Sequence, residues 1–157
     1  MPAPSVAYRI ADGRRPLYDG TGASLHGGRW NSPGRPVIYA AETFANAMLE
    51  VLAHANLSLV PRHHAFIRIE IPASVAIKDI KPAQLPGWPH TPESLCRALG
   101  DAWLNGLTSA VLRVPSIVTS GHERNLVLNP AHPHFARLRA TPPEPVLWDP
   151  RLLTAPR

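Results

Sequence analysis

Proline is the feature of this sequence that most limits what the chain can fold into. The 157 residues include 19 prolines, which lie along the whole chain instead of in one proline-rich linker. Proline lacks a backbone N–H and fixes φ, so it interrupts helices and the interior of sheets. We therefore expect many short helices and strands joined by stiff loops. No repeat or change of composition divides the chain, which predicts one domain over residues 1–157 with a proline-rich tail at 142–157.

Hydrophobic periodicity predicts both strands and helices. Residues 66–71 alternate between apolar and polar side chains, which is typical of a half-buried strand. Apolar residues recur at helical spacing over residues 43–55, and a second helix is expected to begin with Thr91 as its N-cap and to end at Gly106. Shorter strands are predicted at residues 6–10, 37–40, 75–77, 110–114 and 125–128, and a glycine-rich loop at 11–28. This order of elements predicts an α+β domain with mixed or antiparallel sheets and flanking helices.

Composition excludes several classes of protein. Hydrophobic residues make up 45% of the chain and charged residues 17%, which does not fit intrinsic disorder. No apolar run approaches the roughly 20 residues of a membrane span, and the first residues lack the pattern of a signal peptide. A single cysteine, Cys96, cannot form an internal disulfide and is expected to be a small core residue. We therefore expect a globular cytoplasmic protein.

The basic residues are almost all arginine. The net charge is +5, and 14 of the 16 basic residues are arginines because only Lys78 and Lys81 are lysines. Arginine binds phosphate and carboxylate through two parallel hydrogen bonds, although a GC-rich genome would enrich arginine without any such role. A small nucleic-acid-binding module is one interpretation of this charge. The sequence contains no basic run and no helix-turn-helix, RRM or KH signature to support it.

The common motifs of phosphate and metal sites are absent from the sequence. It has no P-loop, no dinucleotide fingerprint, no His-Glu-x-x-His and no Cys-x-x-Cys. The pairs His63-His64 and His132-Pro133-His134 lack a second cluster at zinc-ligand spacing, so we expect no metal site. The segment Gly27-Gly28-Arg29-Trp30-Asn31 stands out instead, because two glycines allow the backbone to approach a ligand and Arg29 can hold a diphosphate. Its structural alternative is a turn with a solvated Arg29 and a buried Trp30.

Three ordered blocks of the sequence resemble the RES domain family. The first runs from Leu25 to Gly34 and continues through Val37-Ile38-Tyr39-Ala40-Ala41-Glu42, the second is Leu49-Glu50-Val51-Leu52 followed by His54, and the third comprises residues 114–118 and 123–133. The family takes its name from an Arg, a Glu and a Ser, which match Arg29, Glu50 and Ser116. The resemblance covers about residues 8–135, most of the chain.

The resemblance implies a specific function. RES proteins are toxins of bacterial toxin–antitoxin pairs, each partnered by an Xre-type antitoxin, and their fold is similar to that of diphtheria-toxin-like ADP-ribosyltransferases. Members deplete NAD by releasing nicotinamide, and some are described as phosphorolytic or as modifying a protein, so water, phosphate and a protein all stay open as the acceptor. We accordingly expect NAD as a consumed substrate with no prosthetic group, an oligomer with itself or the antitoxin, and contact with DNA only through the antitoxin. Residues Thr119-Ser120-Gly121-His122 depart from the family pattern, so Ser120 stays open as an alternative to Ser116.

The chemistry of NAD cleavage suits these residue types. Nicotinamide is already a cationic leaving group in NAD, so the reaction needs no metal, and its transition state resembles the oxocarbenium ion of glycoside hydrolysis. We expect Arg29 to bind the diphosphate and Tyr39 to stack on nicotinamide. Glu50 is expected to contact the ribose or stabilise its positive charge, and Ser116 to fix the ribose or the Glu50 rotamer. The remaining residues expected to contact NAD are Trp30, Asn31 and Asn125.

Each of these residues also has an ordinary structural interpretation. Glu50 can be a solvated helix acid, Tyr39 a core residue and Ser116 a turn residue. Two other functions remain open at this point. One is ADP-ribosylation of a protein acceptor, which would use the same pocket; the other is the nucleic-acid-binding module considered above.

Overall fold

The protein is built around a β-sheet whose two halves are joined by only one residue pair. The computed structural model describes residues 3–54 and 61–153. Neighbouring strands follow the order β4-β5-β6-β2-β1-β3-β7, with β8 also paired to β3, and every pairing except the parallel β4–β5 pair is antiparallel. The strands are β1 (Ser5–Asp12), β2 (Ile38–Ala41), β3 (His64–Ile71), β4 (Ile77–Asp79), β5 (Val111–Pro115), β6 (Arg124–Leu128), β7 (Arg139–Ala140) and β8 (Glu144–Pro145).

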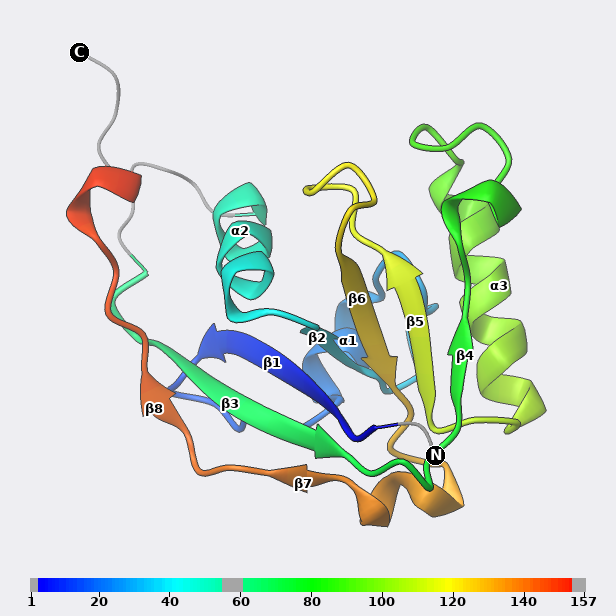
Figure 1. Cartoon of the computed structure of the whole chain (residues 1–157), viewed down its shortest axis with the longest axis horizontal. Helices are drawn as coiled ribbons and strands as arrows, with labels where there is room; N and C mark the ends of the chain where they lie inside the picture. The colour runs from blue at the N-terminus through cyan, green and yellow to red at the C-terminus, as the bar shows by residue number, and fades with distance from the viewer. Residues whose placement is uncertain (1–2, 55–60, 154–157) are drawn as a thin grey trace.

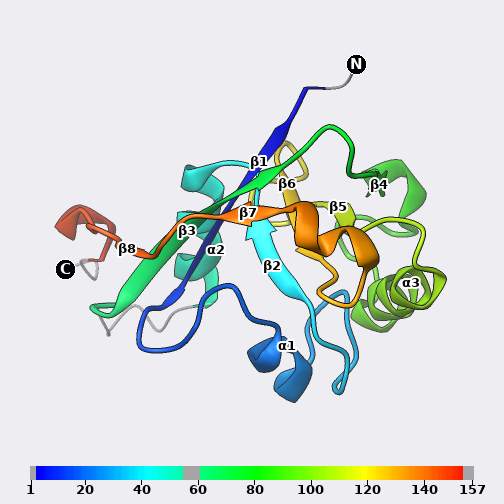
Figure 2. The same cartoon turned by 90° about the horizontal axis from the view of Figure 1, so that it is seen from below.

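Among the described residues, the helices α1 (Thr21–His26), α2 (Phe44–His54) and α3 (Glu93–Gly106) flank this sheet (Figure 1). Figures 1 and 2 both place α3 alongside β4 and β5, and α2 next to β1 and β2. Short 3-10 segments at Pro82–Gln84, Pro133–Arg137 and Pro150–Leu152 each begin with a proline, where the missing N–H costs nothing. The predicted α+β class, with a mixed sheet and flanking helices, is confirmed.

The sheet divides between β1 and β2. Eight residue pairs join β1 to β3, whereas the single pair Tyr8↔Ala41 joins β1 to β2. The two halves therefore diverge on either side of this pair. The divergence leaves room between β1, β2 and the neighbouring α2 for a cavity, described below.

Helix α2 owes its position to its first turn and to its apolar stripe. The Thr43 hydroxyl accepts a hydrogen bond from the Asn46 N–H at 3.0 Å, so Thr43 is the N-cap. Phe44 packs edge-on against Tyr8 of β1 and Phe66 of β3. The prediction of a helix over 43–55 is confirmed for the residues that the structure describes, and Ala55 lies outside them.

The start of α3 differs from the prediction. The helix begins at Glu93, Pro92 occupies the N-cap position, and no side chain caps the first turn. Thr91 was the expected cap, but its side chain is buried and its Oγ1 has no hydrogen-bond partner among the described residues. The buried face of α3 includes Cys96 and Trp103, which confirms Cys96 as a core residue.

Two other predictions need correction. Residues 11–28 are not loop throughout, because α1 forms within them. The N–H of Thr21, at the start of α1, donates a hydrogen bond to the Asp19 carboxylate. The predicted strand at 75–77 is displaced to β4 at Ile77–Asp79, and Val75 is a buried loop residue. The other predicted strands agree with β1, β2, β3, β5 and β6 to within two residues, whereas the short strands β7 and β8 were not predicted. In the tail, Val146 is buried against α2 and β1 side chains, whereas Leu147 is exposed.

Helix α3 meets the Arg29 turn at a point where no side chain fits. A Cβ atom at Gly100 would lie 1.7 Å from the carbonyl oxygen of Trp30. We expect Gly100→Ala to lower the free energy of unfolding by about 1–3 kcal/mol, because the strain of overpacking exceeds the gain in helix propensity. Urea denaturation measures this change. Gly106→Ala is the matched control on the same helix, since its nearest contact would be an ordinary 4.0 Å, and equal stability of the two variants would contradict the prediction.

None of the helices in residues 3–54 and 61–153 is long and apolar enough to cross a membrane.

Candidate active site

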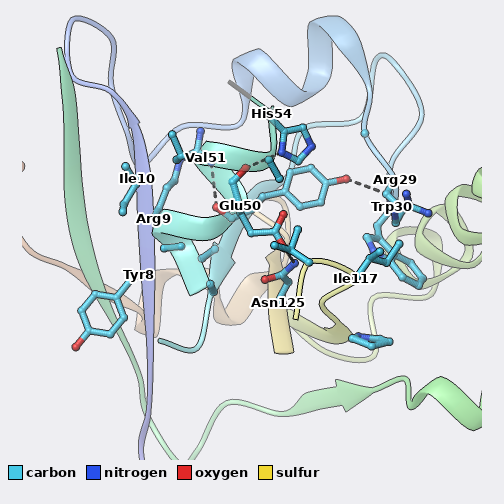
Figure 3. Close-up of a pocket in the computed structure, with 18 of the residues that line it drawn as sticks. Tyr8, Arg9, Ile10, Arg29, Trp30, Glu50, Val51, His54, Ile117 and Asn125 are labelled. Atoms are coloured by element: carbon cyan, nitrogen blue, oxygen red, sulfur yellow. Dashed lines mark hydrogen bonds between the residues drawn. The ribbon is translucent and has the colours of Figure 1, made fainter. Parts of the chain in front are cut away.

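A cavity of about 760 Å³ lies where the two halves of the sheet diverge. Its walls come from β1, β2, α2, the start of β6, the Gly27–Trp30 turn and the segment from Pro115 to Val118 that follows β5. Figure 3 shows side chains from these separate segments around one space. The volume falls within the roughly 300–1,000 Å³ typical of small-molecule sites.

Glu50 is the only carboxylate that lines this cavity among the described residues. Its Oε1 accepts a hydrogen bond from the Ser116 hydroxyl at 2.9 Å and another from Asn125 Nδ2 at 2.8 Å. Its Oε2 has no hydrogen-bond partner in the part of the chain that the structure describes. The carboxylate is therefore held through one oxygen and offers the other to the cavity. The structure thus places Glu50 in a cavity and not at a solvated position on the outer surface of the helix.

Ser116 lies beneath the cavity and Ser120 does not. The Ser116 side chain is 0% exposed, and its backbone is fixed by the Glu123 carbonyl and the Gly121 N–H at 3.0 and 2.8 Å. Ser120 is exposed on the turn that follows, with a φ of 57°. Of the two serines left open by the sequence, Ser116 is the one that contacts Glu50.

The Gly27-Gly28-Arg29 turn is held from below by Tyr39. The Tyr39 hydroxyl accepts from the Trp30 N–H at 3.0 Å and donates to Asn31 Oδ1 at 2.6 Å. Burial raises the pKa of Tyr39 to about 12, so this hydroxyl stays protonated and can donate. A Cβ at Gly28 would lie 2.6 Å from the Tyr39 oxygen, which explains the glycine. The Tyr39 ring also lines the cavity.

Asn31 and Trp30 support this turn rather than the cavity surface. Asn31 is 0% exposed and does not line the cavity. Its amide donates to the carbonyls of Ala23 and Arg35, both at 2.9 Å, and its oxygen accepts from Tyr39, so both of its polar atoms are engaged within the turn. Trp30 is 3% exposed and packs in the core beneath α3, reaching the cavity wall with only a small part of its surface. We therefore assign Asn31 to the turn and Trp30 to the core.

Arg29 lies on the cavity wall and has no partner in the part of the chain that the structure describes. It is partly exposed and makes no hydrogen bond or ion pair with any residue in 3–54 or 61–153. The residues around it belong to a turn whose shape is fixed by Tyr39 and Asn31. The turn thus fixes where the Arg29 side chain leaves the backbone, and no described residue occupies the five N–H donors of its guanidinium.

Arg9 is a second cation in the cavity, and the sequence analysis missed it. Its Nε donates to the Leu17 carbonyl at 2.7 Å and its Nη1 to the Tyr39 carbonyl at 3.0 Å. The second of these hydrogen bonds joins β1 to β2 beside the single residue pair that links the two strands. Its Nη2 has no partner among the residues described. Burial lowers the pKa of Arg9 from its ordinary value, and the carboxylate of Asp19 opposes this shift.

The cavity therefore combines two guanidinium groups with one carboxylate. In Figure 3, Glu50 lies between Arg9 on one side and Arg29 on the other. His54 and His64 also line the cavity. Burial lowers the pKa of His64, which favours its neutral form. Such a site suits a ligand that carries negative charge at one end and develops positive charge near Glu50.

No group of three or more His, Cys, Asp or Glu side chains within residues 3–54 and 61–153 is placed to hold a metal ion. The His132-Pro133-His134 segment has a structural role instead, because His132 Nδ1 accepts from the His134 N–H at 3.0 Å at the start of a 3-10 turn.

Comparison with known proteins identifies the family of this chain. The RES domain model matches residues 6–149. The "Prs ADP-ribosylating toxin" of Sphingobium sp. (strain YBL2) is 36% identical over 154 residues, covering 93% of this chain and 95% of that protein. The "Toxin Res" of Pseudomonas putida (strain KT2440) is 40% identical over 116 residues, covering 73% and 78%.

A solved structure shows the same fold. The Mycobacterium tuberculosis MbcT–MbcA toxin–antitoxin complex contains a chain that matches with a TM-score of 0.73 and 24% identity, over 91% of this chain and 84% of that one. The resemblance drawn from the three sequence blocks is confirmed by the family model and by both curated relatives. This chain belongs to the RES domain family.

Proposed function

We propose that this chain is the toxin of a toxin–antitoxin pair. Its relatives in Sphingobium and Pseudomonas are named toxins, and the matching solved structure is of a toxin–antitoxin complex. The partner we propose is an antitoxin, of the Xre type that the family resemblance implies. Contact with DNA would then be made only through that partner.

We further propose that the cavity binds NAD and that the protein cleaves the bond between nicotinamide and ribose. The observation that carries this proposal is the arrangement of Glu50 in one cavity with Arg9 and Arg29, with Oε1 held by Ser116 and Asn125 and Oε2 without a hydrogen-bond partner among the described residues. Two guanidinium groups suit a diphosphate, because each can form charge-assisted hydrogen bonds with its oxygens. A carboxylate with a free oxygen suits a sugar that becomes cationic.

The proposed reaction consists of bond cleavage, stabilisation of the resulting positive charge and attack by a nucleophile. The C1′–N bond of the nicotinamide riboside breaks, and its electron pair leaves with the neutral nicotinamide. Positive charge develops on C1′ and the ring oxygen, and the Glu50 carboxylate stabilises it. A nucleophile with an O–H or N–H bond attacks C1′ and gives up its proton, with Glu50 positioned to accept it. With water as nucleophile, the products are nicotinamide and ADP-ribose.

A protein acceptor is the second candidate, and one observation favours it. The Sphingobium relative, 36% identical over nearly the whole chain, is named an ADP-ribosylating toxin. Transfer to a protein uses the same cleavage step and differs only in the nucleophile. The site described here serves both outcomes, so the acceptor has to be identified by the product.

The product of the purified protein tests both proposals. We expect nicotinamide to be released from NAD, and in bacteria expressing the chain without an antitoxin we expect NAD to fall before growth stops. Equal amounts of nicotinamide and free ADP-ribose indicate hydrolysis, whereas a lysate protein that gains the mass of one ADP-ribose unit indicates transfer. Coexpression with the antitoxin should restore growth. An intact NAD pool in arrested cells, together with no ADP-ribosylated protein, would refute NAD as the substrate.

A further inference from the structure

Asn46 is a buried residue on α2 whose side-chain amide has no role in the reaction proposed above. It is 0% exposed and lies four residues before Glu50, so the two side chains occupy the same face of the helix. A fully buried amide is costly unless its polar atoms are hydrogen-bonded. The partners of Asn46 are two of the groups that hold Glu50.

Four side chains form a closed ring beneath the cavity. Asn46 Nδ2 donates to Asn125 Oδ1 at 3.0 Å, and Asn125 Nδ2 donates to Glu50 Oε1 at 2.8 Å. Ser116 Oγ lies 2.9 Å from Glu50 Oε1 and 3.2 Å from Asn46 Oδ1. The ring thus runs from α2 through β6 and the residue after β5 and back to α2.

The direction of the ring depends on Asn46. If the amide of Asn125 were rotated by half a turn, its oxygen would face the Glu50 carboxylate, and two acceptors would be in contact. The NH₂ group of Asn46 opposes this rotation because it needs an acceptor on Asn125. Asn46 therefore keeps the donor of Asn125 directed at Glu50.

Asn46 also gives the Ser116 hydroxyl a choice of acceptor. Ser116 has one hydrogen and two acceptors within reach, Glu50 Oε1 and Asn46 Oδ1. When a ligand forms a hydrogen bond with Glu50, the Ser116 hydroxyl can rotate and donate to Asn46 Oδ1 instead, so that no buried hydrogen is left unpaired. Glu50 is then released from one bond while Asn125 still holds it.

We propose that Asn46 is a positioning residue, which directs Glu50 through Asn125 and accepts the Ser116 hydrogen bond when Glu50 engages the substrate. The kinetic consequence of this inference rests on the proposed NAD cleavage, whereas the hydrogen-bonded ring is observed independently of any substrate. It predicts that turnover depends on a hydrogen-bond donor at position 46, while substrate affinity depends on it little.

Asn46→Asp tests this inference because its carboxyl has nearly the shape of the amide. At pH 8 the new carboxylate has no hydrogen for Asn125, so we expect kcat to fall about 10- to 100-fold with KM changed less than about threefold. A buried carboxyl beside a second carboxylate takes up a proton at higher pH than an exposed one. The protonated form can donate to Asn125 and accept from Ser116, so kcat should recover toward the parent as pH falls to about 6. The other titratable or charged groups near the ring come from several elements. Glu50 belongs to the ring itself, Thr43 links Glu123 to the start of α2, and His54 Nδ1 lies 2.7 Å from the Glu50 carbonyl oxygen. Arg9, Arg29 and His64 line the same cavity as Glu50.

Two controls separate positioning from folding. Asn46→Leu cannot donate at any pH, so its kcat should stay low throughout the pH range. Asn105→Asp makes the same chemical change on the exposed surface of α3 and should keep the parental profile. A folded Asn46→Asp protein with the parental pH profile, or one that loses kcat equally at every pH, would overturn the inference.

A measurement without substrate keeps this test apart from the proposed function. In ¹⁵N NMR, the side-chain NH₂ signal of Asn125 should move with pH in Asn46→Asp as the new carboxyl titrates, and should return toward its parental position at low pH. An Asn125 signal that is the same in both proteins at every pH would also overturn the inference. Failure of the parent to release nicotinamide would instead refute NAD cleavage and leave the NMR result to decide on Asn46.

Discussion

Glu50→Gln is expected to reduce nicotinamide release by about 100-fold or more while leaving NAD affinity within about threefold of the parent. The two oxygens of Glu50 have different partners, which makes this substitution informative. The glutamine oxygen can take the place of Oε1 and accept from Ser116 and Asn125, since both donors remain. Its NH₂ group then replaces Oε2, where the carboxylate faced the cavity. The ring survives, and only the negative charge is lost where the ribose becomes cationic.

Glu70→Gln is the matched control for this experiment. Glu70 is an exposed acid on β3, outside the cavity, and pairs with Arg68 at 2.9 Å. Its neutralisation should leave turnover unchanged, because an exposed ion pair contributes little. Steady-state nicotinamide release gives turnover, calorimetry with NAD gives affinity, and circular dichroism confirms folding. Parental turnover by a folded Glu50→Gln protein would show that Glu50 takes no part in the reaction.

Much of the fold follows from local patterns, and the rest depends on tertiary contacts. The alternation of residues 64–71 reflects a strand whose apolar side chains face the core, and periodicity detects such burial directly. The capping of α3 could not be predicted this way. Thr91 and Pro92 form a favourable helix start, but the Thr91 side chain is buried in the fold, and the helix begins after the proline instead. Burial overrode the local preference.

The candidate site is only partly visible in the sequence. Arg29, Glu50 and Ser116 come from a turn, a helix and a strand end that no periodicity brings together, and only the family resemblance linked them before the structure did. Arg9 and Asn46 were missed, although each carries a signal: Arg9 is a charge inside an apolar strand, and Asn46 is an amide beside the apolar stripe of α2. The sequence predicts that Asn31 contacts NAD as part of the Gly27–Asn31 segment, and in the structure the amide of Asn31 is hydrogen-bonded inside the turn.

Arg29→Ala is expected to lower kcat/KM for NAD by roughly 10- to 100-fold, corresponding to the loss of about 1.5–3 kcal/mol from a hydrogen bond to a charged group. The parental guanidinium has no partner among the described residues, so its removal leaves no buried group unpaired. The turn should keep its shape, because Tyr39 and Asn31 hold the neighbouring backbone. Stability is therefore expected to change little, and the loss should be seen mainly in KM, in contrast to Glu50→Gln.

Two further variants show whether the shape or only the charge of Arg29 matters. Arg29→Lys keeps the charge but loses the planar fork, so it should recover only part of the affinity if a diphosphate is bound through two parallel hydrogen bonds. Arg15→Ala removes the same side chain from an exposed position outside the cavity and controls for the change in net charge. Full recovery by lysine would reduce the role of Arg29 to long-range attraction. Equal losses in Arg15→Ala and Arg29→Ala would remove Arg29 from the site. Arg9, which makes two backbone contacts and whose Nη2 has no partner within residues 3–54 and 61–153, would then be the cation that binds the diphosphate.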